Sequence, residues 1–543
     1  MPQELEGVDN LEMMKSDRIE ESTSDAPNFA GRLAPEIWAA IFLAVVDATA
    51  QEGSRSLTMS KYHPAVIISH VSQQWRELCL HTPALWKRIY IHIPPYLRPL
   101  EVHDPPGAAG LFNRITIWKR QVDRLKELAG TWIARSGNSP LSIIFDEHAA
   151  KYPMNSGWIR KPDSFHADMF HLDGLIDLLC RSSSRWNDVY LGLCLTHIDH
   201  PTFRLLCVPA QSCPAVLREM HMFIGVEEMY STEEWQQVFL QATAGGSILN
   251  TPTLRSLGIG PMELFSRSAS SIVWEDLTDL VLNGSEDVSM IDLVQILLQC
   301  RDLRKCELSI TAQCFLLRAS EDFPGPYVDL PVLEEMTVSI PYHLPPSLSY
   351  RLLLPSLRKL TLDDFYGNRT KSLDELDSGI ARFFEQFGNQ LTYVSLHYLT
   401  LTQSALHYCL RHLPNVVHLE LLGSSYKIAP EERPVLSGDL MRALTPRFDK
   451  SRRFIRDSCL CPGVEEFVCL PSPKTLDEGA FLDFIAARRA GDKSSEDGLG
   501  RLRTVSMSLW GYDFKTVDIM VELQKRGAEL ENFVFLGNGT RLM

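Results

Sequence analysis

The sequence predicts an α/β protein in which a small all-helical module precedes a long solenoid of strand and helix repeats with a parallel sheet. Three observations lead to this prediction. Apolar residues recur at helical spacing over residues 33–86, a six-residue apolar pattern returns twelve times between residues 186 and 535, and helical patterns lie between its copies. The length of 543 residues allows two or three domains, and 45% hydrophobic with 22% charged residues excludes a wholly disordered chain.

The charge distribution narrows the possible partners and locations. Residues 1–30 hold eight acidic residues against two basic ones, which predicts a disordered acidic tail. The chain carries a net charge of −15 without a basic stripe, so we expect no nucleic-acid partner. Its longest apolar run, residues 37–46, is too short for a membrane span. The acidic N-terminus is unlike a secretory signal, and we expect a cytoplasmic or nuclear protein with reduced cysteines.

Residues 31–95 are predicted to form the helical module. Pro35 suits the first position of a helix, a second amphipathic helix follows, and Thr82-Pro83 begins a third short turn. So much apolar surface in about 54 residues predicts that another protein covers part of it. The apolar positions are Ile37, Trp38, Ile41, Phe42 and Val45, then Ile67, Val71, Trp75 and Leu78, then Leu85 and Trp86.

The order and spacing of these residues resemble the F-box-like domain abundant in mushroom-forming fungi. The matching strings are Leu33-x-Pro35-Glu36-Ile37-x3-Ile41-Phe42, Ile68-Ser69-x-Val71-x3-Trp75-Arg76-x-Leu78 and Thr82-Pro83-x-Leu85-Trp86. Residues 132–141 resemble the segment that leads into the first repeat strand of those proteins. Ala34 and Gln73-Gln74 depart from the usual pattern without removing an apolar contact.

That resemblance implies a partner. The module would dock on a Skp-type adaptor, which in turn binds a cullin–RING scaffold. Some of the matching residues must pack the module itself, and the pattern does not separate them from the contact residues. The implied adaptor-binding positions are Leu33, Pro35, Glu36, Ile37, Ile41, Phe42, Val71, Trp75, Leu85 and Trp86.

The rest of the chain repeats the pattern apolar-x-x-apolar-x-apolar at a mean interval of about 31 residues. A strand, a turn and a helix repeated in this way describe a divergent leucine-rich-repeat solenoid, with strands on the inner wall and helices outside. We place this solenoid at residues 141–543 and a linker with a helix at residues 96–140. The copies begin at Trp186, Leu217, Leu254, Leu277, Leu303, Leu333, Leu357, Leu391, Val416, Val464, Leu502 and Leu530.

Helices are predicted between several of these strands. Residues 291–298, 373–387 and 402–413 show helical spacing, and Gly388 and Pro414 end two of them. Ser231-x-x-Glu234 and Thr475-x-x-Glu478 are predicted capping boxes. Inserted loops are expected at residues 430–449 and 491–500.

No catalytic, cofactor or metal site is predicted. The chain lacks phosphate-loop, dinucleotide-loop and nucleophile-elbow motifs. Cys459-x-Cys461 and Cys300 with Cys306 lack histidines at ligand spacing, and Cys306 and Cys469 occupy core positions of the repeats. Asp146-Glu147-His148 follows a strand, where adjacent side chains point to opposite faces, so catalysis there is not expected.

Our interpretation is a substrate-recognition subunit of an SCF-type ubiquitin ligase, whose repeats bind a target protein. Two alternatives stay open: a leucine-rich-repeat interaction scaffold without a ligase role, and an enzyme whose site follows no known motif. Trp510 is either an aromatic contact on the rim or part of the C-terminal cap. The predicted target contacts on the inner wall are Tyr190, His221, Glu307, Thr337, Thr361, Ser395, Glu420 and Ser506, with Trp510 beside them.

Overall fold

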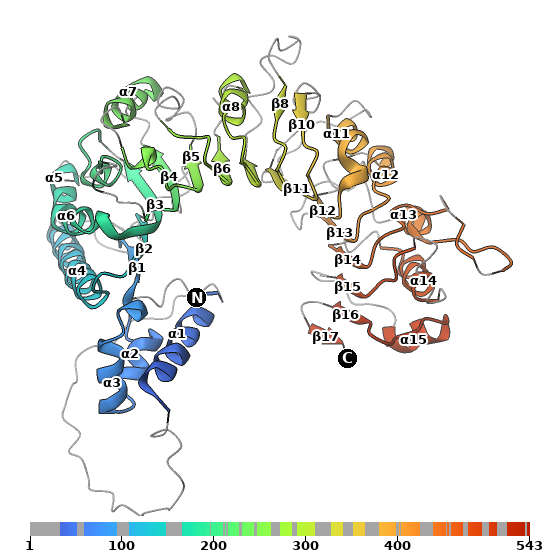
Figure 1. Ribbon diagram of the computed structural model, residues 1–543, viewed down its shortest axis with the longest axis horizontal. Helices are drawn as coiled ribbons and strands as arrows, with labels where there is room; N and C mark the ends of the chain where they lie inside the picture. Colours follow the sequence, from blue (N-terminus) through green and yellow to red (C-terminus); the bar gives the residue numbers. More distant parts are fainter. Residues whose placement is uncertain are drawn as a thin grey trace, which may run out of the picture.

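The computed structural model is an open arc, with the helical module at its N-terminal end, strands along the inside and most helices on the outside (Figure 1). The structure describes residues 33–51, 59–94, 108–147, 165–195, 197–209, 212, 216–226, 231–243, 247–261, 272–284, 290–309, 327–339, 351–363, 379–397, 401, 403–423, 438–451, 453–455, 458–470, 476–490, 499–507, 518–537 and 540–542. The predicted acidic tail and Trp510 lie outside these residues.

The helical module packs around a cluster of three aromatic side chains, Trp38, Phe42 and Trp75. Trp75 lies 4.9 Å from Trp38 and 5.1 Å from Phe42 between ring centroids. Polar side chains cap two helices, because His63 accepts a hydrogen bond from the Ala65 amide and Ser72 accepts one from the Trp75 amide. The module consists of α1 (Pro35–Gln51), α2 (Pro64–Ser69), α3 (Gln73–Leu80) and a 3-10 helix (Pro83–Trp86).

One continuous sheet forms the inner wall. Its order is β1-β2-β3-β4-β5-β6-β7-β9-β11-β12-β13-β14-β15-β16-β17; all neighbours pair in parallel except the last two, which are antiparallel. The predicted α/β solenoid with a parallel sheet is therefore confirmed. The strands are β1 (Arg88–His92), β2 (Leu141–Asp146), β3 (Trp186–Leu195), β4 (Glu219–Val226), β5 (Ser256–Gly260), β6 (Asp279–Asn283), β7 (Lys305–Ser309), β9 (Glu335–Ser339), β11 (Lys359–Asp363), β12 (Tyr393–His397), β13 (His418–Leu422), β14 (Glu466–Cys469), β15 (Thr504–Met507), β16 (Val534–Gly537) and β17 (Thr540–Leu542), and a separate pair is β8 (Val328–Asp329) with β10 (Leu352–Leu353).

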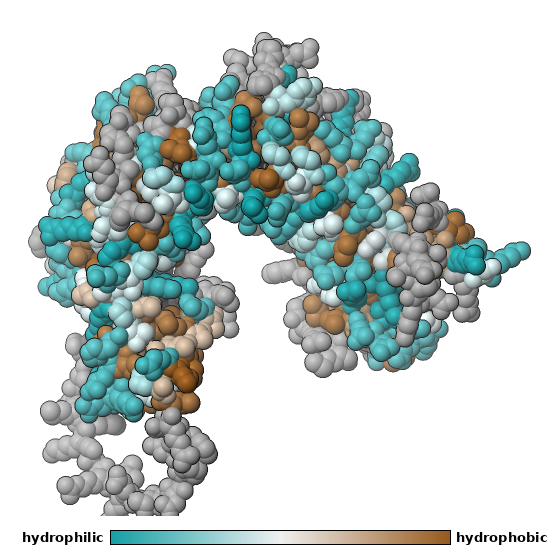
Figure 2. Space-filling view, viewed as in Figure 1, coloured by the Kyte–Doolittle hydropathy of each residue, from teal (hydrophilic) through white to brown (hydrophobic). Residues whose placement is uncertain are grey.

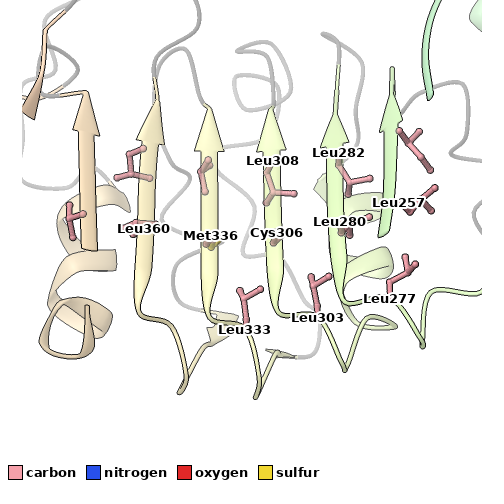
Figure 3. Packing of buried hydrophobic residues seen from close by; sticks show 14 of the residues in the cluster. Leu257, Leu277, Leu280, Leu282, Leu303, Cys306, Leu308, Leu333, Met336 and Leu360 are labelled. Atoms are coloured by element: carbon pink, nitrogen blue, oxygen red, sulfur yellow. The ribbon is translucent and has the colours of Figure 1, made fainter. Parts of the chain in front are cut away.

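Helices and turns cover the outer side of this sheet (Figure 1). Buried and partly exposed residues alternate along most strands, so that alternate side chains fill the space beneath the helices. Figure 3 shows the resulting ladders, in which Leu303 and Leu333 sit at corresponding places in successive repeats. The helices are α4 (Ala108–Arg135), α5 (Phe165–Met169), α6 (Asp173–Arg181), α7 (Thr232–Thr243), α8 (Met290–Leu297), α11 (Gly379–Phe387), α12 (Gln403–Arg411), α13 (Gly438–Leu444), α14 (Glu478–Arg489) and α15 (Ile519–Lys525).

The solenoid starts earlier than predicted. β1 pairs with β2 from Arg88↔Ser142 to His92↔Asp146, so the first repeat strand lies inside the region assigned to the helical module. The string Trp86 to Ile91 carries the same six-residue pattern as the other strands. The region predicted as a linker with a helix contains α4, whose Trp118, Val122 and Ala129 are buried in the common core. The predicted boundary at residue 141 is therefore wrong.

The last predicted repeat is displaced by two residues. Val534 pairs with Thr504, which places Asn532 rather than Leu530 at the start of that copy. Asn532 adopts a φ of 56°, a left-handed conformation that asparagine tolerates better than most residues. This turn shifts the apolar side chains relative to the pattern read from the sequence.

The predicted helix caps, helix ranges and loops agree with the structure in part. The Ser231 capping box is confirmed, with the Ser231 amide donating to Glu234 Oε2 at 2.7 Å and the Glu234 amide donating to Ser231 Oγ at 3.3 Å. α8 and α12 match their predicted ranges, and α11 begins at residue 379. α14 is capped by Asp477 instead of Thr475, since its carboxylate accepts from the Ala480 amide. The loop predicted at residues 430–449 contains α13.

Candidate interaction surfaces

The helical module exposes a stripe of large apolar side chains. Ile37 is 49% exposed and Val71 61% exposed, although both lie in ordered helix or turn. Spacings of four along α1 place its members on one side of the helix, and Figure 2 shows hydrophobic surface gathered on this module. Folded monomers rarely leave such side chains together in water. The apolar stripe consists of Leu33, Ile37, Ile41, Val45, Ile67 and Val71.

Burial separates the predicted adaptor contacts into two groups. Phe42, Leu85 and Trp86 are at most 2% exposed, so their prediction as contact residues is corrected: they form the core of the module. Trp75 is partly buried against that core. The remaining predicted residues are exposed: Leu33, Pro35, Glu36, Ile37, Ile41 and Val71.

Two exposed members of the apolar stripe were missing from the predicted contacts. Val45 is 42% exposed and Ile67 is 52% exposed. Each follows or precedes a predicted contact by four residues, since Val45 follows Ile41 and Ile67 precedes Val71. Helical spacing could therefore have identified them.

The module and the first repeat share one core. Trp86 donates from Nε1 to the Cys79 carbonyl at 2.8 Å, and its ring lies edge-on to Trp132 of α4 at 5.0 Å. The guanidinium of Arg135 lies 4.5 Å from the centroid of the Trp86 ring. His63 packs against Trp132, and burial, with a smaller contribution from Arg88, lowers the pKa of His63 to about 4. These contacts fix the direction of the apolar stripe relative to the inner wall.

The predicted target contacts form one row on the inner wall. Strand register joins Tyr190 to His221, Glu307 to Thr337 and Thr361, then Ser395 to Glu420. Gly258 and Val281 continue the row between His221 and Glu307, and Val468 joins Glu420 to Ser506. Ser395 is only 3% exposed, so the prediction that it contacts a target is wrong. It is a buried residue of the wall, covered by its neighbours. The other seven are partly exposed.

A second polar row lies on the same face, two residues earlier in each strand. This row was not predicted, because the predicted contacts were only those strand positions that lie between two apolar residues. The period of two in a strand places both rows on one face, so the alternation could have found it. The row contains Arg88, Ser142, Asp188, Glu219, Ser256, Asp279, Lys305, Glu335, Lys359, Tyr393, His418, Glu466 and Thr504.

From β7 to β14 this row and Glu420 form a charge ladder, in which each charged group has a partner. Glu335 lies 4.0 Å from Lys305 and 3.5 Å from Lys359, and the Lys359 ammonium lies 4.9 Å from the Tyr393 ring. His418 stacks on Tyr393 at 4.5 Å. We define the charge ladder as Lys305, Glu335, Lys359, Tyr393, His418, Glu420 and Glu466.

His418 joins two carboxylates at the end of the ladder. Its Nε2 lies 2.9 Å from Glu420 Oε1 and its Nδ1 2.7 Å from Glu466 Oε2. The hydrogen bond with Glu420 is the largest cause of a raised His418 pKa, and the same bond lowers the pKa of Glu420. Burial, followed by the charge of Glu420, raises the pKa of Tyr393 to about 12. The ladder is therefore nearly self-compensated at neutral pH.

The polar residues after β2 serve the interior. Glu147 accepts hydrogen bonds from the Cys194 amide at 3.0 Å and from Thr202 Oγ1 at 3.3 Å, and its other oxygen lies 3.6 Å from His200 Nε2. His200 is 1% exposed and Thr202 is fully buried, so a substrate cannot reach them. His148 lies outside the described residues. The cluster ties the segment after β3 to the end of β2.

The cysteines at repeat positions are core residues. Cys306 and Cys469 are at most 1% exposed, and burial raises the pKa of both thiols, which keeps them neutral. Cys461 donates to the Leu410 carbonyl at 3.3 Å. Within the described ranges no three His, Cys, Asp or Glu side chains are arranged to hold a metal ion. None of the described helices is long and apolar enough to cross a membrane.

No family model and no curated protein matches the chain. Among solved structures, one similar chain comes from the crystal structure of the Rad7 and Elc1 complex in yeast, with 15% sequence identity and a TM-score of 0.37. The match covers 82% of this chain and 90% of that one.

Proposed function

We propose that the protein is the substrate-recognition subunit of an SCF-type ubiquitin ligase. Its F-box-like module would dock on a Skp-type adaptor and, through it, on a cullin–RING ligase, while the solenoid binds a target protein. The observation that carries this proposal is the apolar stripe, because its six side chains are 40–61% exposed while Phe42, Leu85 and Trp86 of the same module are buried.

The energy available from this stripe suits a stable partner. Full burial of one large apolar side chain contributes about 1.5–3 kcal/mol, so completing the burial of six half-exposed ones contributes on the order of 5 kcal/mol. Aspartate at such a position would place a charge in the dry contact, which costs far more than the lost apolar area. The stripe is thus expected to tolerate alanine better than aspartate.

The shared core at Trp86 supports the second half of the proposal. A receptor of this kind needs no catalytic residue, because it accelerates transfer by holding a target lysine close to the activated ubiquitin. Such positioning requires a fixed relation between the docking module and the target-binding wall. The contacts of Trp86 with Trp132, Arg135 and the Cys79 carbonyl provide that relation.

Co-purification with a Skp-type adaptor tests the proposal. The wild-type chain is expected to form a one-to-one complex, and Ile41→Asp and Val71→Asp are each expected to weaken it at least tenfold. Val521→Asp is the matched control, because Val521 is 44% exposed on α15 at the other end of the arc. Thermal unfolding of each variant checks its fold. A folded wild-type chain that binds no adaptor would favour the interaction scaffold without a ligase role.

A further inference from the structure

Three carboxylates lie close together on the second polar row of the wall, between β3 and β6. Asp188 pairs in register with Glu219, and Ser256 separates Glu219 from Asp279. Neighbouring strands are about 4.8 Å apart, so the carboxylates of Asp188 and Glu219 lie one strand apart and Asp279 two strands farther. The three acidic residues thus face the same inner space.

Glu219 stands at the centre of this group without a compensating cation. Among the described residues none forms an ion pair with the Glu219 carboxylate. Burial, then the charges of Asp188 and Asp279, raise the pKa of Glu219. Asp188 and Asp279 accept hydrogen bonds from neutral donors, the Asn187 amide at 2.6 Å and the Thr278 hydroxyl at 2.7 Å.

Cations lie near the two outer carboxylates of the group, and Lys305 of β7 pairs in register with Asp279. Lys87, Arg88 and Arg218 act on Asp188, the first of the three carboxylates. Arg88 also pairs with Asp47 of α1 at 3.1 Å, and Arg255 lies 3.8 Å from Asp276, outside the group. No cation contributes to the pKa shift of Glu219.

Aromatic rings border the three carboxylates on the same strands. Tyr190 and Phe223 lie 5.5 Å apart between ring centroids. β5 has glycine at both of the next inward positions, and the neighbouring rings of β4 occupy the space that side chains would fill. His221 Cγ lies 3.0 Å from the place of a Cβ at Gly258, and Phe223 Cδ1 lies 3.1 Å from that place at Gly260.

These rings add little positive charge of their own. Burial lowers the pKa of His221 despite the nearby Asp279, so its imidazole is neutral at pH 7. The faces of tyrosine and phenylalanine rings attract cations. The acidic patch, defined as Asp188, Glu219 and Asp279 with Tyr190, His221 and Phe223, therefore combines three carboxylates with aromatic surface, and no cation acts on the central carboxylate, Glu219.

The charge ladder on the other half of the same wall differs in just this respect. There Glu335 has two lysine partners and Glu420 and Glu466 share His418. Both halves display carboxylates to the same concave space, but each carboxylate of the charge ladder has a partner, whereas Glu219 of the acidic patch forms no ion pair among the described residues.

We propose that the acidic patch binds an extended segment of a partner protein in which lysine or arginine side chains alternate with other residues. The inference deepens the proposed function by naming the class of target, and it rests on that function only for the fate of the bound protein. The width of four strands is about 14 Å, which matches four or five extended residues at about 3.3 Å each. Arginine can pair with a carboxylate through two hydrogen bonds and stack on an aromatic face. Nucleic acid is excluded here by repulsion.

Peptide binding to the full chain tests this proposal. The probe is a fluorescein-labelled pool of nonapeptides with arginine at alternate positions and a random mixture elsewhere, and its neutral counterpart carries citrulline in place of arginine. The variant is Asp188→Asn with Glu219→Gln and Asp279→Asn. The matched control is Glu335→Gln with Glu420→Gln and Glu466→Gln, which changes the net charge by the same amount.

The expected result is at least tenfold tighter binding of the arginine pool than of the citrulline pool by wild type. The acidic-patch variant should lose at least tenfold in affinity for the arginine pool, and the control variant less than threefold. Equal affinities for the two pools, no saturable binding, or equal losses in both variants would overturn the proposal. Adaptor co-purification with the same proteins is an independent readout, so failure of the ligase assignment is distinguishable from failure of the patch.

Discussion

Large apolar side chains are exposed on α1 of the helical module but buried on α11 of the solenoid. In the module Ile37 and Ile41 of α1 are 49% and 41% exposed, whereas Phe383 and Phe384 of the solenoid helix α11 are at most 1% exposed. Each internal repeat is covered by a neighbour on both sides, which closes the core without outside help. The module has a repeat on one side only. Under the proposed function, we expect the uncovered side of α1 to be the place where the partner packs.

The strongest way to break this comparison is to remove the side chain that both regions share. Trp86→Ala should lower the free energy of unfolding by about 3–5 kcal/mol, because it opens a cavity beside Trp132 and removes the indole hydrogen bond to the Cys79 carbonyl. Denaturant unfolding gives the value. Ile41→Ala, on the exposed stripe, is the control and should cost about 1 kcal/mol or less. A small loss in Trp86→Ala would show that module and solenoid are independent.

A buried arginine extends the comparison, since the solenoid interior is not purely apolar. Arg488 is 1% exposed and donates to the carbonyls of Leu444, Cys461 and Pro462 at 3.0–3.3 Å, and burial lowers its pKa. Arg488→Met should destabilise the chain by about 3 kcal/mol, because the hydrogen bonds from the guanidinium to these buried carbonyls are lost. Arg442→Met removes an exposed arginine of α13 and should leave the unfolding midpoint nearly unchanged. Similar unfolding midpoints for the two variants would contradict this account.

Gly258 tests whether the rings of the acidic patch require a residue without a side chain on the neighbouring strand. A Cβ at Gly258 would overlap Nδ1 of His221, so Gly258→Ala should cost about 1–3 kcal/mol in stability. Gly225→Ala is the control, because its Cβ would meet only the Leu193 carbonyl at 3.8 Å. Adding His221→Ala to Gly258→Ala should restore part of the loss. No restoration in thermal unfolding would mean that the strand itself, and not the ring, requires glycine.

Local patterns were sufficient for most strands because each repeat strand carries its own six-residue alternation. The first strand was missed because Trp86 ends the helical motif and also begins the strand pattern, and one residue was assigned to one element only. The burial of Phe42 was beyond prediction, since helical spacing gives a face but does not say what covers it. The partners of His418 were equally hidden, because Glu466 comes from a strand 48 residues away.

The smallest change in stability is expected at the charge ladder, where the charged side chains of the solenoid pair with one another. The pKa of His418 is raised in the folded chain, so the stability that it contributes is complete below its unfolded pKa of about 6.5 and is lost as pH rises through the folded pKa. The lowered pKa of Glu420 keeps that carboxylate charged down to acidic pH. Relative to wild type, His418→Gln should therefore lose about 0.5–1 kcal/mol more at pH 5.5 than at pH 8.5.

The control for this pH dependence is His407 of α12, where the sign reverses. Burial and, next, Arg411 lower the pKa of His407, so the folded chain disfavours its protonation and loses stability as pH falls. His407→Gln should thus relieve a destabilisation at pH 5.5 and have little effect at pH 8.5. Denaturant unfolding of both variants at the two pH values measures the difference. If the two variants changed stability with pH in the same direction, His418 would not belong to a charge-compensated ladder. Glu420 and Glu466 would then be open to a cationic partner.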